Sequence, residues 1–151
     1  MNIKQFVTLV LILLPALAFG QTAAEMDVML QADTVSGARL ARFVLGSSGL
    51  LPPGLSGPQA EKAAYDMALS NGWITISPEE NATQKDAAFL IMKAFNLKGG
   101  VMYSLLGNPR YAYREMVYQK LIMGRTDQAM KVSGKKLLQI LDKTIKYAGM
   151  D

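Results

Sequence analysis

Hydrophobic positions recur along the chain in a pattern that appears more than once. The segment AYDMALSNGWI (residues 64–74) aligns with AYREMVYQKLI (residues 112–122) at a constant offset of 48 positions, with alanine, tyrosine and several apolar residues in register. Each copy is followed by a second apolar-periodic segment, TQKDAAFLIM from Thr83 and SGKKLLQIL from Ser133. A third such segment, VSGARLARFVL, begins at Val35. Apolar spacing of this kind predicts helices, and its repetition predicts stacked helical units that share one core.

Cap and turn residues predict where these helices begin and end. A hydroxyl residue, which can accept backbone N–H groups of the first helical turn, stands before each of three segments: Ser36, Thr83 and Ser133. Asp86 completes a capping-box pattern three residues after Thr83. We also expect a short helix between Gly100 and Gly107, and at most a short extended segment at residues 73–76. The predicted fold is all-α, with tandem helix-loop-helix repeats packed into one compact domain and units at about residues 24–50, 58–98 and 108–148.

The first 20 residues, MNIKQFVTLVLILLPALAFG, have the pattern of a secretory signal peptide. The apolar run is shorter than the roughly 20 residues that a membrane-spanning helix needs, although an uncleaved anchor is the alternative. The chain has no cysteine, which excludes a lipid attached to cysteine and any disulfide. We predict cleavage near Gly20, a single domain at residues 21–151 with no stable membrane span, and a bacterial exported protein. The predicted location is the periplasm, with secretion or surface association as alternatives.

Charge is unevenly distributed over the predicted mature chain. Residues 21–97 carry five Lys and Arg against eight Asp and Glu, and residues 98–151 carry ten against four, which gives −3 and +6. A basic second half predicts an acidic partner, such as an anionic envelope polymer or an acidic patch on a protein. Nucleic acid is not expected as a partner of an exported protein.

The helix predicted in NPRYAYREMVYQKLI (residues 108–122) divides into two arcs. One arc and its counterpart in the first copy are expected to pack in the core: Ala112, Tyr113, Met116 and Val117, with Ala64, Tyr65, Ala68 and Leu69. The other arc is a candidate binding face, because arginine can bind carboxylate or phosphate and tyrosine can stack on a sugar or a peptide: Arg110, Tyr111, Arg114 and Tyr118. The alternative is that this arc packs against the insertion at residues 99–107, with Tyr103 as a stacking partner.

A second candidate site lies at the start of the last predicted helix. Lysines surround a helix N-terminus there, where free backbone N–H groups can hold an anion. The residues are Ser133, Gly134, Lys135 and Lys136. An ordinary solvated face is the alternative.

Catalysis is not predicted. The chain has no histidine and no cysteine, which removes the commonest general base, the commonest soft metal ligands and the thiol nucleophile. No glycine-rich phosphate loop or Gly-x-Ser-x-Gly elbow is present, and we expect no cofactor and no bound metal. Paired carboxylates could still hydrolyse a glycan, but the acidic residues do not fall in pairs on predicted helices.

The predicted units resemble S-layer homology repeats, a family of helix-loop-helix units that usually come in threes and hold proteins to cell-wall polymers. The resemblance rests on AAYDMALSNGWI with ATQKDAAFLIMKAFNL and on YAYREMVYQKLIMG with VSGKKLLQILDKTI. Only Thr83 and Asp86 match the ends of the family's Thr-Arg-Ala-Glu-like tetrad, so no binding residue is carried over. Two functions are therefore considered: a non-catalytic adaptor for another periplasmic or outer-membrane protein, and, as the resemblance implies, binding of cell-wall glycan.

Overall fold

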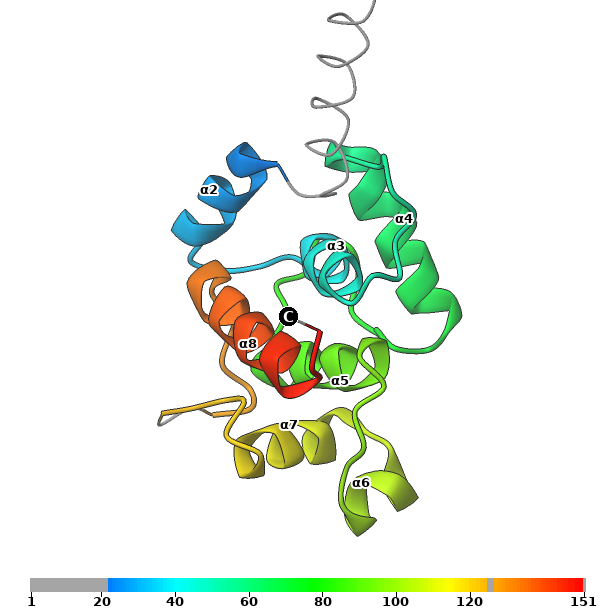
Figure 1. Ribbon diagram of the computed structural model, residues 1–151, viewed down its shortest axis with the longest axis vertical. Coiled ribbons are helices and arrows are strands. Elements are labelled where there is room, and N and C mark those ends of the chain that lie inside the picture. The colour runs from blue at the N-terminus through cyan, green and yellow to red at the C-terminus, as the bar shows by residue number, and fades with distance from the viewer. Residues whose placement is uncertain (1–21, 125–126, 151) are drawn as a thin grey trace, which may run out of the picture.

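The protein is all-helical in the computed structural model, which describes residues 22–124 and 127–150 (Figure 1). These residues form α2 (Ala23–Gln31), α3 (Gly37–Ser47), α4 (Gly57–Ser70), α5 (Gln84–Ala94), α6 (Val101–Leu106), α7 (Pro109–Tyr118) and α8 (Gly134–Tyr147). The all-α prediction is confirmed, and residues 73–76, where at most a short extended segment was expected, form no strand. None of the described helices has the length and apolar character needed to cross a membrane. The predicted signal peptide lies outside the described residues.

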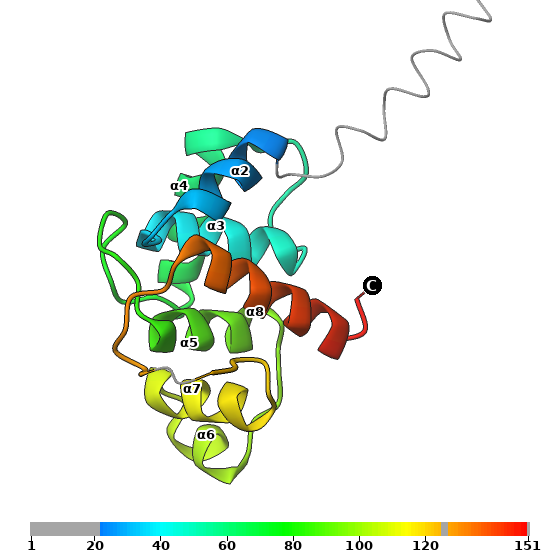
Figure 2. The same ribbon diagram turned by 90° about the vertical axis from the view of Figure 1, so that its left-hand side faces the viewer.

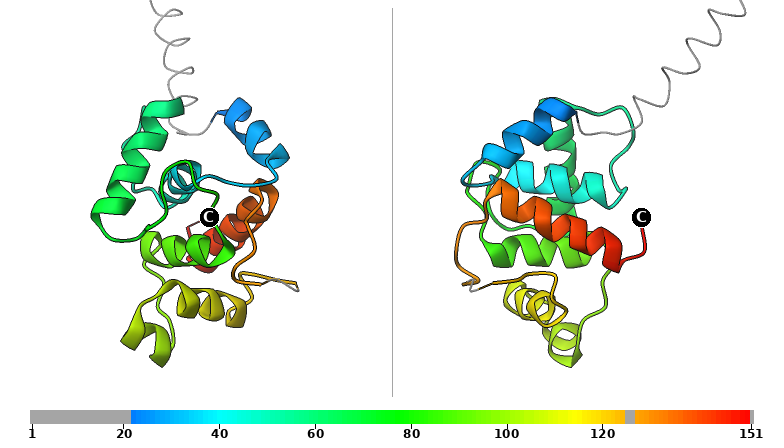
Figure 3. Two further views of the ribbon diagram at one scale, coloured as in Figure 1. Left: turned by 180° about the vertical axis from the view of Figure 1, so that it is seen from behind. Right: turned by 60° about the vertical axis from the view of Figure 1, so that its left-hand side comes forward.

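Three inner helices, α3, α5 and α8, each pack against one outer helix. Helix α4 packs on α3, α7 packs on α5, and α2 packs on α8, while α3 also contacts both other inner helices. The views in Figures 1 and 3 show the outer helices α2, α4 and α7 spaced around the inner ones. Fully buried side chains of the inner helices form the middle of the core: Leu40, Val44, Leu45, Leu90, Ile91, Leu137 and Ile140. The first described helix therefore closes the structure by packing on the last.

A closed ring of backbone hydrogen bonds joins the segments that precede the inner helices. The N–H of Val35 donates to the carbonyl of Val132 at 3.1 Å, Val132 donates to Ala82 at 3.0 Å, and Ala82 donates to Val35 at 2.8 Å. Two residues later along each segment the pattern recurs, with three bonds of 2.9 Å: Gly37 to Glu80, Gln84 to Met130 and Gly134 to Ala32. Each inner helix therefore begins against the loop that leads into another inner helix, which fixes the three helix starts relative to one another.

The predicted caps of the inner helices are confirmed. The hydroxyl oxygen of each cap accepts the backbone N–H three residues on, in the pairs Ser36 with Arg39, Thr83 with Asp86 and Ser133 with Lys136. At Thr83 the Asp86 carboxylate also accepts from the Thr83 backbone N–H at 2.8 Å and from its hydroxyl at 2.6 Å. Gly100 and Gly107 bound α6 as predicted.

Replacing Thr83 with alanine should lower the free energy of unfolding by about 1–2 kcal/mol, because it removes the capping box of a buried inner helix. Ser56 provides a matched control. It occupies the same cap position before α4 but makes no side-chain cap bond, so Ser56→Ala should change stability by less than about 0.5 kcal/mol. Urea unfolding followed by circular dichroism measures both. Equal losses in the two variants would contradict the capping role of Thr83.

Candidate functional site

Helix α7 presents a narrower buried stripe than predicted. Its buried residues are Ala112, Tyr113 and Met116, and their counterparts Ala64, Tyr65 and Ala68 on α4 are buried as well. The prediction was wrong for the fourth position of each arc, because Val117 is 41% exposed and Leu69 is 50% exposed. The physical reason is that each outer helix has a single inner helix as its main packing partner, α5 for α7 and α3 for α4. One partner covers a stripe, not a broad arc.

Helix α6 is attached to α7 by polar contacts with its N-terminal side. The Glu115 carboxylate accepts the Gly100 N–H at 2.9 Å. The Gln119 amide donates to the Lys98 carbonyl at 3.2 Å and to the other oxygen of Glu115 at 2.9 Å. Tyr103 is the buried residue of α6, and burial raises the pKa of its hydroxyl above the usual value. These contacts hold a short helix that lacks a long packing surface of its own.

A shallow groove runs between α6 and α7. It encloses about 260 Å³ and is lined by Gly100, Val101, Met102, Tyr103, Tyr111, Arg114, Glu115 and Tyr118. The Arg114 guanidinium lies 5.8 Å from the centre of the Tyr111 ring, within the range of a cation–π contact. Tyr118 is 84% exposed at the end of α7. Three residues of the predicted binding face, Tyr111, Arg114 and Tyr118, are therefore brought together around one groove.

Arg110 is separated from that groove. It lines a second depression with Tyr113, Arg114, Asp127 and Gln128. No carboxylate of the described residues pairs with Arg110 or Arg114. Of the four residues of the predicted face, three line the α6–α7 groove, while Arg110 lies beside residues 127–128. Tyr111 is half-buried against the core.

In comparisons of this chain with protein-family models, curated proteins and solved structures, nothing matched.

At the anion site predicted at the start of α8, two of the backbone donors are already engaged. The Gly134 N–H donates to the Ala32 carbonyl at 2.9 Å, and the Lys136 N–H donates to the Ser133 hydroxyl at 3.2 Å. The Lys136 ammonium is also used, because it donates to the Met123 carbonyl. Lys135 is exposed, but Gly134 is buried beneath α2. The N–H groups of Gly134 and Lys136 are therefore not available to an anion.

No metal-binding cluster was found among residues 22–124 and 127–150, since no three His, Cys, Asp or Glu side chains there converge. Glu115 is the one acidic residue of the α6–α7 groove. Its two oxygens are already engaged by Gly100 and Gln119. A carboxylate held in this way positions α6 and has no partner acid in the groove with which to act.

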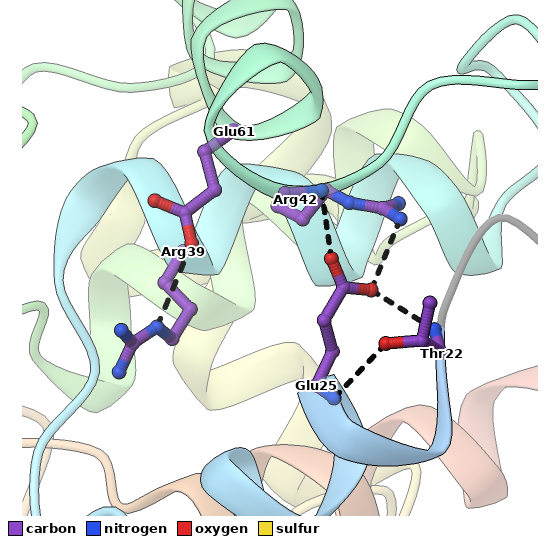
Figure 4. Close-up of polar contacts among 6 residues, drawn as sticks. Thr22, Glu25, Arg39, Arg42 and Glu61 are labelled. Atoms are coloured by element: carbon purple, nitrogen blue, oxygen red, sulfur yellow. Dashed lines mark hydrogen bonds and ion pairs between the residues drawn. The ribbon is translucent and has the colours of Figure 1, made fainter.

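Sequence reasoning missed a polar cluster where α2, α3 and α4 meet (Figure 4). The Arg42 side chain is only 2% exposed, and one of its terminal nitrogens lies 3.5 Å from a Glu25 oxygen. The same carboxylate accepts the Thr22 N–H at 3.0 Å and the Gly57 N–H at 2.9 Å. Nearby, Arg39 and Glu61 form a longer, partly exposed pair at 3.7 Å. The available signal was a single arginine inside the apolar run LARFVL, where every neighbour is a core residue.

Proposed function

We propose that this chain is a non-catalytic exported envelope protein that serves as an adaptor, binding another periplasmic or outer-membrane protein through the α6–α7 groove. The observation that carries the proposal is the open arrangement of Arg114 between Tyr111 and Tyr118. Arginine and tyrosine are among the residues that most often dominate protein–protein binding energy. Export rests on the pattern of residues 1–20.

The chemistry of the groove favours an acidic segment of a protein partner. Arg114 has no carboxylate partner within 4.0 Å among the described residues, so its guanidinium can donate two parallel hydrogen bonds to a partner carboxylate. Val101 and Met102 on the opposite wall offer apolar contact, and Tyr118 offers an exposed ring. A desolvated charge pair surrounded by apolar contacts is typical of an interface centre.

A photo-activated cross-linking residue at position 118, expressed in the source cells, tests this proposal. We expect one discrete protein adduct from position 118 and none from position 28, an exposed apolar position on α2 at the opposite end of the molecule. Mass spectrometry of the adduct would identify the partner. Adducts of the same kind from both positions, or none from position 118, would contradict the proposal.

Binding of cell-wall glycan by S-layer-homology-like units is the second candidate. It is favoured by the closed ring of hydrogen bonds among three helix starts and by the repeated Val-Ser-Gly before α3 and α8, which fit three tandem units around one axis. Co-sedimentation of the purified protein with protein-free peptidoglycan sacculi is the test. Pelleting with the sacculi would support the glycan reading, and a protein that stays in the supernatant would exclude the wall as a direct ligand.

A further inference from the structure

Helix α6 carries an exposed apolar surface, part of which lies outside the α6–α7 groove. Val101, Met102, Leu105 and Leu106, here named the α6 tip, are between 49% and 75% exposed. Their spacing places Leu105 one turn after Val101 and Leu106 one turn after Met102. Leu105 and Leu106 do not line the groove. Four neighbouring apolar side chains on one short helix are more than the isolated exposed residues that ordinary surfaces carry.

The α6 tip protrudes. Figures 1 and 2 show α6 at one end of the molecule, beyond α7 and away from α2 and α4. Its main helix contact is with α7, and the Glu115 and Gln119 bonds fix it there. An apolar helix that protrudes and is fixed to the rest of the fold can insert its side chains into a lipid surface.

Basic side chains flank the tip. Lys98 precedes α6 in the chain, and Arg114 lines the groove together with Val101 and Met102. The segment at residues 98–120 carries four basic side chains against one acidic side chain, which gives +3. The Glu115 charge is partly compensated by its bonds to Gly100 and Gln119. Tyr118, 84% exposed, adds a ring of the kind that settles at a membrane–water boundary. Basic groups around exposed apolar residues are complementary to an anionic lipid surface.

We propose that the α6 tip docks the protein on an anionic lipid bilayer, with Leu105 and Leu106 entering the boundary between headgroups and acyl chains and the surrounding basic residues facing the lipid charges. The proposed contact is peripheral, because only the side chains of one six-residue helix enter the bilayer surface. This inference does not depend on the proposed adaptor function, because a lipid surface alone suffices to test it.

The experiment is co-sedimentation of the purified protein with vesicles, and no partner protein is added. We expect binding to vesicles of phosphatidylglycerol and phosphatidylcholine, and none to phosphatidylcholine alone. The Leu105→Ser/Leu106→Ser variant should bind at least about tenfold more weakly, because two side chains lose their apolar transfer to lipid. Val28→Ser/Leu30→Ser is the matched control. Both of its positions are more than half exposed on α2, so it should bind like the wild type.

Circular dichroism confirms that each variant is folded, which both should be because the altered side chains are exposed. The inference is overturned if the wild type does not bind anionic vesicles, or if the tip variant binds as well as the wild type. Equal losses in the tip variant and the α2 variant would also overturn it. So would a change in the sedimentation coefficient of the tip variant without lipid, since the tip would then be a contact between copies of the chain.

Discussion

Replacing Gly134 with alanine should lower the free energy of unfolding by about 3 kcal/mol or more. A side chain at this position would overlap the carbonyl oxygen of Met29, and would lie 2.7 Å from its carbonyl carbon and 2.8 Å from its sulfur. Backbone atoms cannot move aside as a flexible side chain can. Alanine normally gains about 0.5–1 kcal/mol over glycine in a helix, so the clash outweighs the propensity.

The clash would also separate two segments that close the fold. Gly134 donates its N–H to Ala32, and this bond joins the start of α8 to the end of α2. Lys135→Ala is the matched control, because Lys135 is the exposed neighbour on the same helical turn, and its loss should change stability by less than about 0.5 kcal/mol. Urea unfolding at neutral pH measures both variants. A Gly134→Ala protein as stable as the Lys135→Ala protein would show that α2 and α8 do not approach this closely.

Replacing Glu25 with alanine should be the second most damaging change, at about 3 kcal/mol. Its carboxylate completes the capping box of α2 and accepts the Gly57 N–H at the start of α4. The second contact is the more important one, because Ser56 supplies no side-chain cap to α4. Removal would also leave the Arg42 guanidinium buried without its carboxylate, and an unpaired buried charge is costly.

The structural role of Glu25 is tested by comparing the loss in free energy of unfolding of three variants, measured in urea. Arg42→Met should cost less than Glu25→Ala, since it removes a buried charge whose Nε has no hydrogen-bond partner within the described part of the chain, and it leaves Glu25 bound to two backbone N–H groups. Glu61→Ala should cost less than about 1 kcal/mol, because the Arg39–Glu61 pair is partly exposed and 3.7 Å long. Equal costs for Glu25→Ala and Glu61→Ala would contradict the role given to Glu25.

The features that sequence reasoning predicted correctly depend on residues close together in the chain. The cap bonds at Ser36, Thr83 and Ser133 each join residues three positions apart, and the boundaries of α6 follow from its flanking glycines. The buried residues Ala112, Tyr113 and Met116 follow from helical periodicity. Local rules were sufficient for these features because the interacting atoms belong to one turn or one helix.

The features that were missed depend on contacts between distant segments. The Gly134 N–H seemed available to an anion until Ala32, from the other end of the domain, was found to accept it. Arg42 lies within the apolar run LARFVL, but the run itself does not indicate that α2 and α4 cover this side chain. Arg110 and Arg114 share an arc on a helical wheel and both lie beside residues 127–128, but only Arg114 also lines the groove that α6 forms with α7. Helical periodicity shows which residues share an arc, but it does not show which other segment covers that arc.

The central functional claim is that Arg114, in the α6–α7 groove, holds a protein partner. The most direct measurement compares the yield of the position-118 cross-linked adduct in two variants, Arg114→Ala and Arg110→Ala. They remove the same charge from the same helix, but Arg110 lines only the second depression and not the α6–α7 groove. We expect Arg114→Ala to reduce the adduct about tenfold or more, as for a residue at an interface centre, and Arg110→Ala to leave it nearly unchanged. An adduct that survives Arg114→Ala, or that both variants reduce equally, would contradict the claim.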